Sequence, residues 1–203
     1  MNVVITGSTR GIGLGLAREF LKLGHDVVVS SRGSAAVEKA LSSLQAEFSG
    51  RSIVGKVCEV ADYAQVQGLW EAAVAGLGSV DIWVNNAGTS SDQTPFHELP
   101  TGIFMRIIDT NVKGLMLATH VAYNRMLKQG HGAIYNMEGL GSDGRIAAVG
   151  IGADGAAELF VEWCTADKHH VLVAQAALLE RVDDHLHVRH RGGEQCGHAD
   201  DVG

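Results

Sequence analysis

Thr6-Gly7-Ser8-Thr9-Arg10-Gly11-Ile12-Gly13 is the stretch that decides the fold of this chain. It follows the apolar run 3–5, which is typical of a buried strand, and it opens residues 11–23, which have the apolar period of a helix. A glycine-rich turn in this position can hold an anion, because backbone N–H groups at the start of the helix point towards it. The stretch therefore predicts a phosphate-binding turn between a first strand and a first helix.

Each glycine of this turn has its own expected purpose. We expect Gly7 to permit a sharp exit from the strand, and Gly11 to let backbone N–H groups approach a pyrophosphate with no Cβ in the way. Gly13 is expected to let the helix pack closely on the sheet. The residues predicted to contact a dinucleotide at this turn are Gly7, Ser8, Thr9, Arg10, Gly11, Ile12 and Gly13.

Outward from the turn, apolar runs of strand length alternate with longer runs of helical period. This alternation predicts an α/β fold with a doubly wound parallel sheet, covered by helices on both faces. Strands are expected over residues 3–6, 26–30, 52–57, 81–85 and 132–136, and helices over residues 11–23, 35–48, 63–77 and 111–128.

The composition predicts one globular domain. The chain has 203 residues, 46% of them hydrophobic and 19% charged, and its net charge of −7 argues against nucleic-acid binding. Its three cysteines are odd in number and far apart, as is usual in a reducing compartment. No apolar run approaches about 18 residues, and Met1 leads directly into the first strand. We therefore expect no membrane span, no signal or transit peptide, and a cytoplasmic location.

Ser30-Ser31-Arg32 closes the second predicted strand, where the choice of nucleotide is usually made. A carboxylate there would accept hydrogen bonds from the ribose 2′-OH of NAD(H), and none is present. Arg32 together with Arg10 could instead hold a 2′-phosphate through charge-assisted hydrogen bonds, with Ser31 beside them. The pattern favours NADP(H); the alternative is a pair of solvated surface arginines.

Three further motifs follow predicted strands or open a helix: Cys58-Glu59-Val60, Asn85-Asn86-Ala87-Gly88 and Asp109-Thr110-Asn111. With the glycine turn, they resemble the classical short-chain dehydrogenases/reductases, whose cofactor domain is of the Rossmann type. The resemblance implies that Glu59 and Val60 lie against the adenine ring, and that Asn111 holds a water molecule in a proton relay. It also implies that the turn Asn86, Ala87 and Gly88 steadies the central strands and lines the cofactor.

The stretch 136–145, Asn-Met-Glu-Gly-Leu-Gly-Ser-Asp-Gly-Arg, resembles that of chlorophyll b reductases, which reduce a ring formyl group with NADPH. In that subfamily the usual catalytic serine position corresponds to Gly139, and Ser142 is the available hydroxyl. The resemblance thus implies a small-molecule carbonyl substrate, and family members commonly form homo-oligomers.

One family feature is missing. The family uses a Tyr as its acid/base and a Lys four residues later on the same helix, where the Lys lowers the pKa of the phenol. The three tyrosines of this chain, Tyr63, Tyr123 and Tyr135, are followed at that spacing by Gln67, Leu127 and Gly139. Tyr135 lies in a predicted strand, where a core position is expected. The proton donor is therefore unidentified.

The sequence changes character near Arg145. Residues 1–145 contain 12 Lys and Arg against 13 Asp and Glu, whereas residues 146–203 contain 4 against 10, and six of the ten histidines. We therefore divide the chain into an NADP-binding domain, 1–145, and an atypical tail, 146–203, with one helix expected near 170–187 and disorder after it. Because the tail lacks paired ligand spacing, we predict no metal site at His185, His187, His190, Cys196 and His198.

Three hypotheses follow. The chain is an NADP-dependent carbonyl or formyl reductase, a catalytically inactive nucleotide-binding module, or a product that does not fold stably because one sheet edge stays unpaired. A frameshift or altered splice after Arg145 would explain the abrupt change. Translating the encoding DNA in its other two frames tests this, since a simple frameshift predicts a Tyr-x-x-x-Lys sequence in one of them.

Overall fold

The computed structural model describes residues 1–91, 95–137, 145–151 and 157–163. Within them, seven strands form one sheet in the order β3-β2-β1-β4-β5-β6-β7. The strands are β1 (Asn2–Ile5), β2 (Asp26–Ser31), β3 (Ile53–Val57), β4 (Ile82–Asn85), β5 (Gly132–Asn136), β6 (Arg145–Ile151) and β7 (Ala157–Trp163). The first five are all parallel, which confirms the predicted sheet and its five strands.

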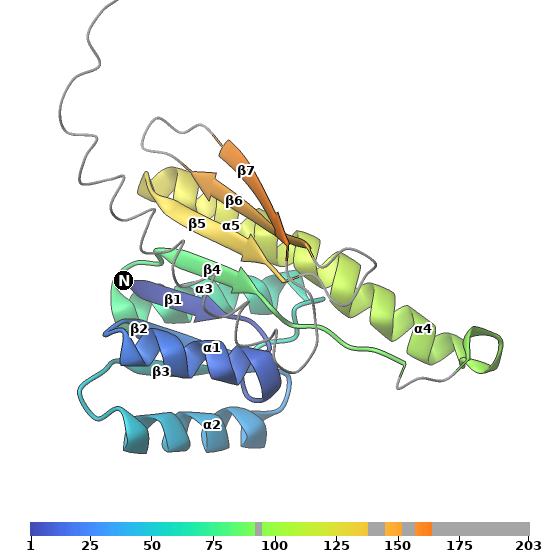
Figure 1. The fold of residues 1–203 in the computed structure, drawn as a ribbon, viewed down its shortest axis with the longest axis horizontal. Helices are drawn as coiled ribbons and strands as arrows, with labels where there is room; N and C mark the ends of the chain where they lie inside the picture. Colours follow the sequence, from blue (N-terminus) through green and yellow to red (C-terminus); the bar gives the residue numbers. More distant parts are fainter. Residues whose placement is uncertain (92–94, 138–144, 152–156, 164–203) are drawn as a thin grey trace, which may run out of the picture.

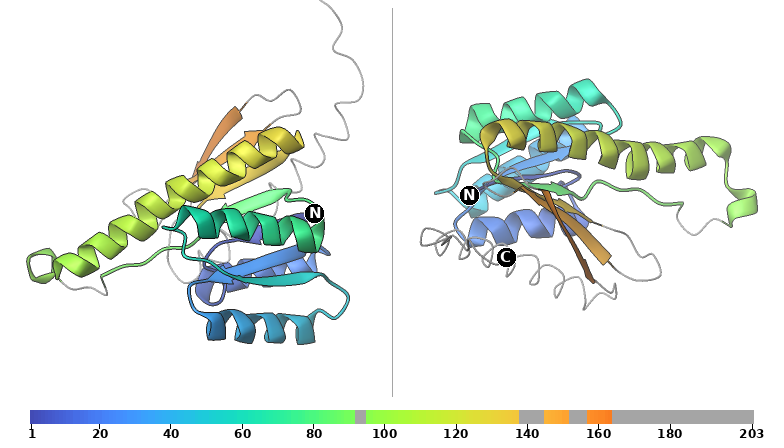
Figure 2. Two further views of the ribbon diagram at one scale, coloured as in Figure 1. Left: turned by 180° about the vertical axis from the view of Figure 1, so that it is seen from behind. Right: turned by 90° about the horizontal axis from the view of Figure 1, so that it is seen from above.

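Helices cover both faces of this sheet (Figures 1 and 2). Helices α1 (Gly11–Lys22) and α2 (Ser34–Glu47) lie on one face, and α3 (Tyr63–Leu77) and α5 (Leu115–Gln129) lie on the other. Successive strand residues point to opposite faces, so Val3 and Ile5 pack with α1 while Val4 packs with α3 and α5. Near-continuous apolar strands are expected in a sheet buried on both faces.

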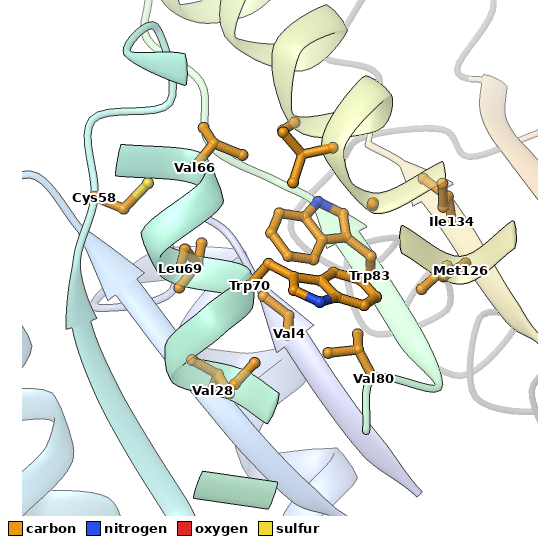
Figure 3. Packing of buried hydrophobic residues seen from close by; sticks show 14 residues of the cluster. Val4, Val28, Cys58, Val66, Leu69, Trp70, Val80, Trp83, Met126 and Ile134 are labelled. Atoms are coloured by element: carbon orange, nitrogen blue, oxygen red, sulfur yellow. The ribbon is translucent and has the colours of Figure 1, made fainter. Parts of the chain in front are cut away.

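Two stacked tryptophans lie at the centre of the α3 and α5 face (Figure 3). The ring centroids of Trp70 and Trp83 are 6.0 Å apart with an interplanar angle of 24°. Both side chains are buried, and Met126 of α5 packs in the same cluster. The cluster joins α3, α5 and β4, and it thereby fixes the strand end that carries the Asn85–Gly88 motif.

The helix before β5 is longer than predicted. Helix α4 (Thr101–Ile108), the π-helical segment η2 (Asp109–Gly114) and α5 follow one another without a break and extend beyond the sheet (Figure 1). The motif that starts with Asp109 therefore lies inside a helical stretch and does not open it, which corrects the prediction. No residue of α4 is buried, so the periodic burial on which sequence patterns depend is absent from this helix. A short 3₁₀ turn, η1 (Phe96–Glu98), precedes it.

The sheet continues past β5. Strand β6 pairs antiparallel with β5, and β7 pairs antiparallel with β6. The edge of β5 is therefore paired, in contrast to the third hypothesis, in which it stays unpaired. Strand β6 contains two Ala and one Gly, which have low strand propensity. The sequence pattern therefore does not predict this strand. The predicted helix near 170–187, the predicted disorder after it and the histidines of the tail lie outside the described residues.

Among the helices that the structure describes, none combines the length and the apolar character that a bilayer crossing requires.

Candidate functional site

The turn after β1 has the conformation that its glycines predict. Gly7 has a φ of +64°, and a Cβ built on it would lie 2.7 Å from the Cα of Ala87. A Cβ on Gly13 would meet the side-chain nitrogen of Asn86 and lie 2.7 Å from the carbonyl oxygen of Gly7. Gly11 differs, because its φ is +55° yet nothing lies within 4 Å of its Cβ position. Two glycines are thus required by packing, and the third faces open space.

Helix α1 begins directly at this open space. Arg10 is its N-cap residue, and the Arg10 side chain makes no capping hydrogen bond to the helix. The first N–H groups of a helix have no partner within it, so an uncapped N-terminus beside an open glycine is suited to an anion. Arg10 and Ile12 are exposed around this opening, whereas Thr9 is partly buried.

Ser8 is buried beneath the turn. Its hydroxyl donates to the carbonyl oxygen of Ile5 at 2.6 Å and accepts from the backbone N–H of Ser30 at 2.9 Å. Its own N–H donates to the carbonyl oxygen of Ser30 at 2.9 Å. The side chain of this predicted cofactor residue therefore ties the turn to β2.

Thr6 and Asn86 join the turn after β1 to the turn after β4. The Thr6 hydroxyl oxygen accepts from the backbone N–H groups of Asn86 and Ala87, both at 3.0 Å. In return, the Asn86 amide donates to the carbonyl oxygens of Thr6 at 2.9 Å and Gly7 at 3.1 Å. Asn86 and Ala87 thus fix the glycine turn, while Gly88 is exposed beside them. No role of its own is predicted for Thr6 from the sequence. The structure shows that its buried hydroxyl joins the two turns.

Asn85, the first residue of the Asn85–Gly88 motif, is buried and joins three elements, although no role of its own is predicted for it from the sequence. Its side-chain oxygen accepts from the indole N–H of Trp83 at 2.7 Å. Its amide group donates to the hydroxyl of Thr119 at 2.9 Å and to the side-chain oxygen of Asn136 at 2.7 Å. The ends of β4 and β5 are thereby held together and against α5.

Arg32 and Glu59 meet at the carboxyl ends of β2 and β3. Arg32 Nη1 lies 3.7 Å from Glu59 Oε2, with 52% and 32% of the two side chains exposed. Ser31, which precedes the arginine, donates its hydroxyl to the carbonyl oxygen of Gly33. No carboxylate stands at the carboxyl end of β2, as predicted, but Glu59 brings one to the same corner from the loop after the neighbouring strand.

The other residues of the Cys58-Glu59-Val60 motif are buried. Val60 lies close to Gly114 of η2: a Cβ built on Gly114 would lie only 2.6 Å from Cγ2 of Val60. The η2 segment therefore approaches this loop closely. Burial, and then the nearby charge of Glu59, raises the pKa of the Cys58 thiol to about 12. This thiol is therefore protonated at neutral pH and is not a nucleophile.

Asn111 lies in η2, and its side chain is occupied by the backbone of Thr89. Its oxygen accepts from the Thr89 N–H and its amide donates to the Thr89 carbonyl oxygen, both at 2.9 Å. The residue thus positions the segment that leaves the β4 turn; the water-holding role stays a prediction. Ser142 lies outside the described residues.

None of the three tyrosines is in a position that identifies it as the acid/base of the reaction. Tyr135 is buried in the core on the α1 face, as predicted. Tyr63 is 41% exposed and its ring packs beside His120, with 5.9 Å between centroids. Tyr123 packs against the tryptophan cluster. Within the described part of the chain, no group of three or more His, Cys, Asp or Glu could hold a metal ion.

The parallel strands β1 to β5 and the open glycine turn at the start of α1 are typical of α/β domains that bind dinucleotides. The family of this chain follows from comparison with known proteins, because the model of the short chain dehydrogenase family matches residues 1–164. The chain belongs to this family of oxidoreductases, whose members bind a nicotinamide cofactor.

Curated relatives make the similarity more specific. Chlorophyll(ide) b reductase NOL of Oryza sativa subsp. japonica is 43% identical over 146 residues, which are 71% of this chain and 43% of that protein. The same enzyme of Arabidopsis thaliana is 44% identical over 71% of this chain and 42% of that protein. The chain therefore spans less than half the length of these two relatives.

Solved structures share the fold. A variant actinorhodin polyketide ketoreductase with NADPH has a TM-score of 0.61 and 32% identity, covering 66% of this chain and 51% of that one. A short chain dehydrogenase/reductase from Burkholderia phymatum in complex with NAD has a TM-score of 0.62 and 29% identity, covering 66% and 47%. Proteins of this fold are thus seen with either dinucleotide.

The expected cytoplasmic location is wrong. The related chlorophyll(ide) b reductases of rice and Arabidopsis are chloroplastic. The prediction depended on the number and spacing of the cysteines and on the absence of a long apolar run. These features are compatible with more than one reducing compartment, so they do not identify the cytoplasm.

Proposed function

We propose that this chain binds NADP(H) at the turn after β1 and serves an oxidoreductase that reduces a carbonyl or formyl group, as in the chlorophyll(ide) b reductases. The observation that carries the proposal is Gly11, whose positive φ and empty Cβ position lie at the uncapped start of α1. A backbone opening of this kind is suited to the pyrophosphate that NADP(H) and NAD(H) share.

The preference for the phosphorylated dinucleotide is inferred from Arg32. Its guanidinium is about half exposed at the end of β2, and Arg10 is exposed at the start of α1. The oxygens of a 2′-phosphate can accept two or more charge-assisted hydrogen bonds, and the planar guanidinium of an arginine is suited to donate them. Strand β2 ends in Ser30 and Ser31, so no carboxylate at that end of the strand repels the phosphate.

A bound nicotinamide supplies the hydride for the carbonyl carbon, and the protein must then deliver a proton to the oxygen. Ser142 is the hydroxyl that we propose for polarising that oxygen. Asn111 is proposed for the proton path, since it stands next to the β4 turn through its hydrogen bonds with Thr89. The choice of a formyl substrate is supported by the similarity to the chlorophyll(ide) b reductases of rice and Arabidopsis, together with the resemblance of residues 136–145 to enzymes that reduce a ring formyl group.

A second candidate is a nucleotide-binding module without turnover. The observation that favours it is the state of the tyrosines: none has a Lys four residues later, and Tyr135 is only 4% exposed. A phenol buried in the core cannot reach a substrate oxygen. On this alternative, the dinucleotide site is intact and the proton donor is missing.

One experiment separates the two candidates. NADPH binding is measured by fluorescence, and NADPH oxidation is followed with a panel of aldehydes, for the wild type, Ser142→Ala and the control Ser43→Ala on the exposed surface of α2. Oxidation that Ser142→Ala slows and Ser43→Ala does not supports the reductase. Binding without oxidation supports the inactive module, and no binding of NADPH overturns both.

A further inference from the structure

The carboxylate of Glu59 reaches the predicted 2′-phosphate corner from a strand other than β2. Strands β2 and β3 are parallel and Ser31 is aligned with Val57, so the residues that follow both strands leave the sheet side by side. The backbone N–H of Cys58 donates to the carbonyl oxygen of Ser31 at 3.0 Å and extends this alignment. The pairing of Arg32 with Glu59 is thus a consequence of sheet register.

The loop that carries Glu59 is held in place by hydrogen bonds. The backbone N–H of Glu59 donates to the side-chain oxygen of Gln65 at 2.9 Å, and Gln65 donates in turn to Asp62 at 2.9 Å. One carboxylate oxygen of Glu59 accepts from the N–H of Ala61 at 3.3 Å. The other oxygen is the one that lies 3.7 Å from Arg32. The side chain is therefore oriented with one oxygen towards the guanidinium.

We propose that Glu59 is a specificity-determining residue for the dinucleotide, because its carboxylate pairs with Arg32 and competes with the 2′-phosphate of NADP(H) for that guanidinium. The inference rests on the proposed binding of NADP(H) and deepens it. NADH has no 2′-phosphate and so does not compete for Arg32. Glu59 therefore narrows the difference in affinity between the two dinucleotides.

The test is the ratio of the dissociation constants for NADH and NADPH. Glu59→Gln keeps an oxygen for the Ala61 N–H and removes the charge. We expect the Kd for NADPH to fall about two- to fivefold, the range that an exposed ion pair contributes, and the Kd for NADH to change by less than about twofold. Glu59→Asp, with a shorter side chain, is a second variant and should move the ratio in the same direction.

Two comparisons isolate the pair. In an Arg32→Ala background, Glu59→Gln should leave the ratio unchanged, because the competition has been removed. Glu71→Gln removes the same charge from an ion pair of similar length, 3.8 Å to Arg125, between α3 and α5, and it should also leave the ratio unchanged.

The outcomes are distinct. If the wild type binds NADPH but neither Glu59 variant moves the ratio, or if the shift persists without Arg32, the role of Glu59 is overturned and the proposed function stands. If the wild type binds no NADPH, the proposed function itself fails, and the role of Glu59 fails with it.

Discussion

The turns that follow β1 and β2 lie side by side at one edge of the sheet, but they are held in different ways. The β1 turn is fixed by buried groups, with the hydroxyls of Thr6 and Ser8 each bonded to backbone atoms of other segments. The β2 turn ends in Arg32, an exposed side chain whose ion-pair partner is also partly exposed. On the proposed function, backbone groups therefore recognise the shared pyrophosphate, whereas the choice of dinucleotide depends on charges that water and salt screen.

The largest expected effect tests the buried turn. Gly13→Ala should lower the free energy of unfolding by about 3 kcal/mol, the upper end of the range for overpacking, because the added Cβ meets backbone atoms of Gly7 and Ser8 that cannot move aside. Chemical denaturation measures this. The control Gly102→Ala adds a Cβ in open space on α4 and should be neutral or stabilising. Equal destabilisation by both changes would contradict the close packing of the β1 turn.

A second effect tests the hydrogen bonds between the β1 and β4 turns. Thr6→Val keeps the shape of the side chain but leaves the N–H groups of Asn86 and Ala87 without their acceptor, which should cost about 2 kcal/mol of stability. Thr6→Ser retains the oxygen and should recover most of the loss. If the serine variant is as unstable as the valine variant, the hydroxyl is not the group that joins the two turns.

The exposed corner should respond in binding and not in stability. Arg32→Ala is expected to weaken NADPH binding about tenfold, the equivalent of about 1.4 kcal/mol, and to leave NADH binding nearly unchanged. The thermal midpoint should stay close to that of the wild type, because the side chain is about half exposed. Arg125→Ala, which removes a comparable surface arginine, controls for net charge. Equal losses for NADPH and NADH would show that Arg32 does not choose between them.

The smallest effect concerns the helix that carries the Glu59 loop. Asp62 caps α3 by accepting from the N–H groups of Gln65 and Ala64, and these hydrogen bonds hold the pKa of its carboxyl below its ordinary value of 3.8. A lowered folded-state pKa stabilises the protein above the unfolded-state pKa, and this stability is lost as the pH falls through the folded-state value.

The stability difference between the wild type and Asp62→Ala should therefore be present at neutral pH and shrink below about pH 4. Urea denaturation at several pH values measures it, with the exposed Glu38→Ala on α2 as the matched loss of a carboxylate. A difference that stays constant down to pH 3 would mean that the charge of Asp62 does not cap α3.

Local requirements explain what the sequence could predict. The β1 turn needs glycine at Gly7 and Gly11 because of their positive φ, so its residues are visible in the sequence itself. The five parallel strands are bounded by turns and are rich in β-branched residues, and their observed ends lie within one residue of the predicted ones. Such features depend on neighbours in the chain.

Contacts between segments that are distant in the chain explain what the sequence could not predict. The pair of Arg32 and Glu59 follows from the register of β2 and β3, and the hub at Asn85 needs Thr119 and Asn136 to come from other elements. The start of α4 was missed for a different reason. No residue of this helix is buried and large apolar side chains such as Met105 are exposed, so it lacks the contact with the sheet that the other predicted helices make.

The central claim is that the uncapped start of α1 beside Gly11 holds the pyrophosphate of NADP(H). A parallel fluorescence titration of the wild type and Gly11→Ala with NADPH tests it most directly, since the added methyl group enters the open space and touches no protein atom. The φ of +55° makes alanine strained at this position, so chemical denaturation first establishes that the variant is folded. The account predicts saturable binding to the wild type and at least about tenfold weaker binding to a folded Gly11→Ala variant. Equal affinity of the two proteins, or no binding to the wild type, would contradict it.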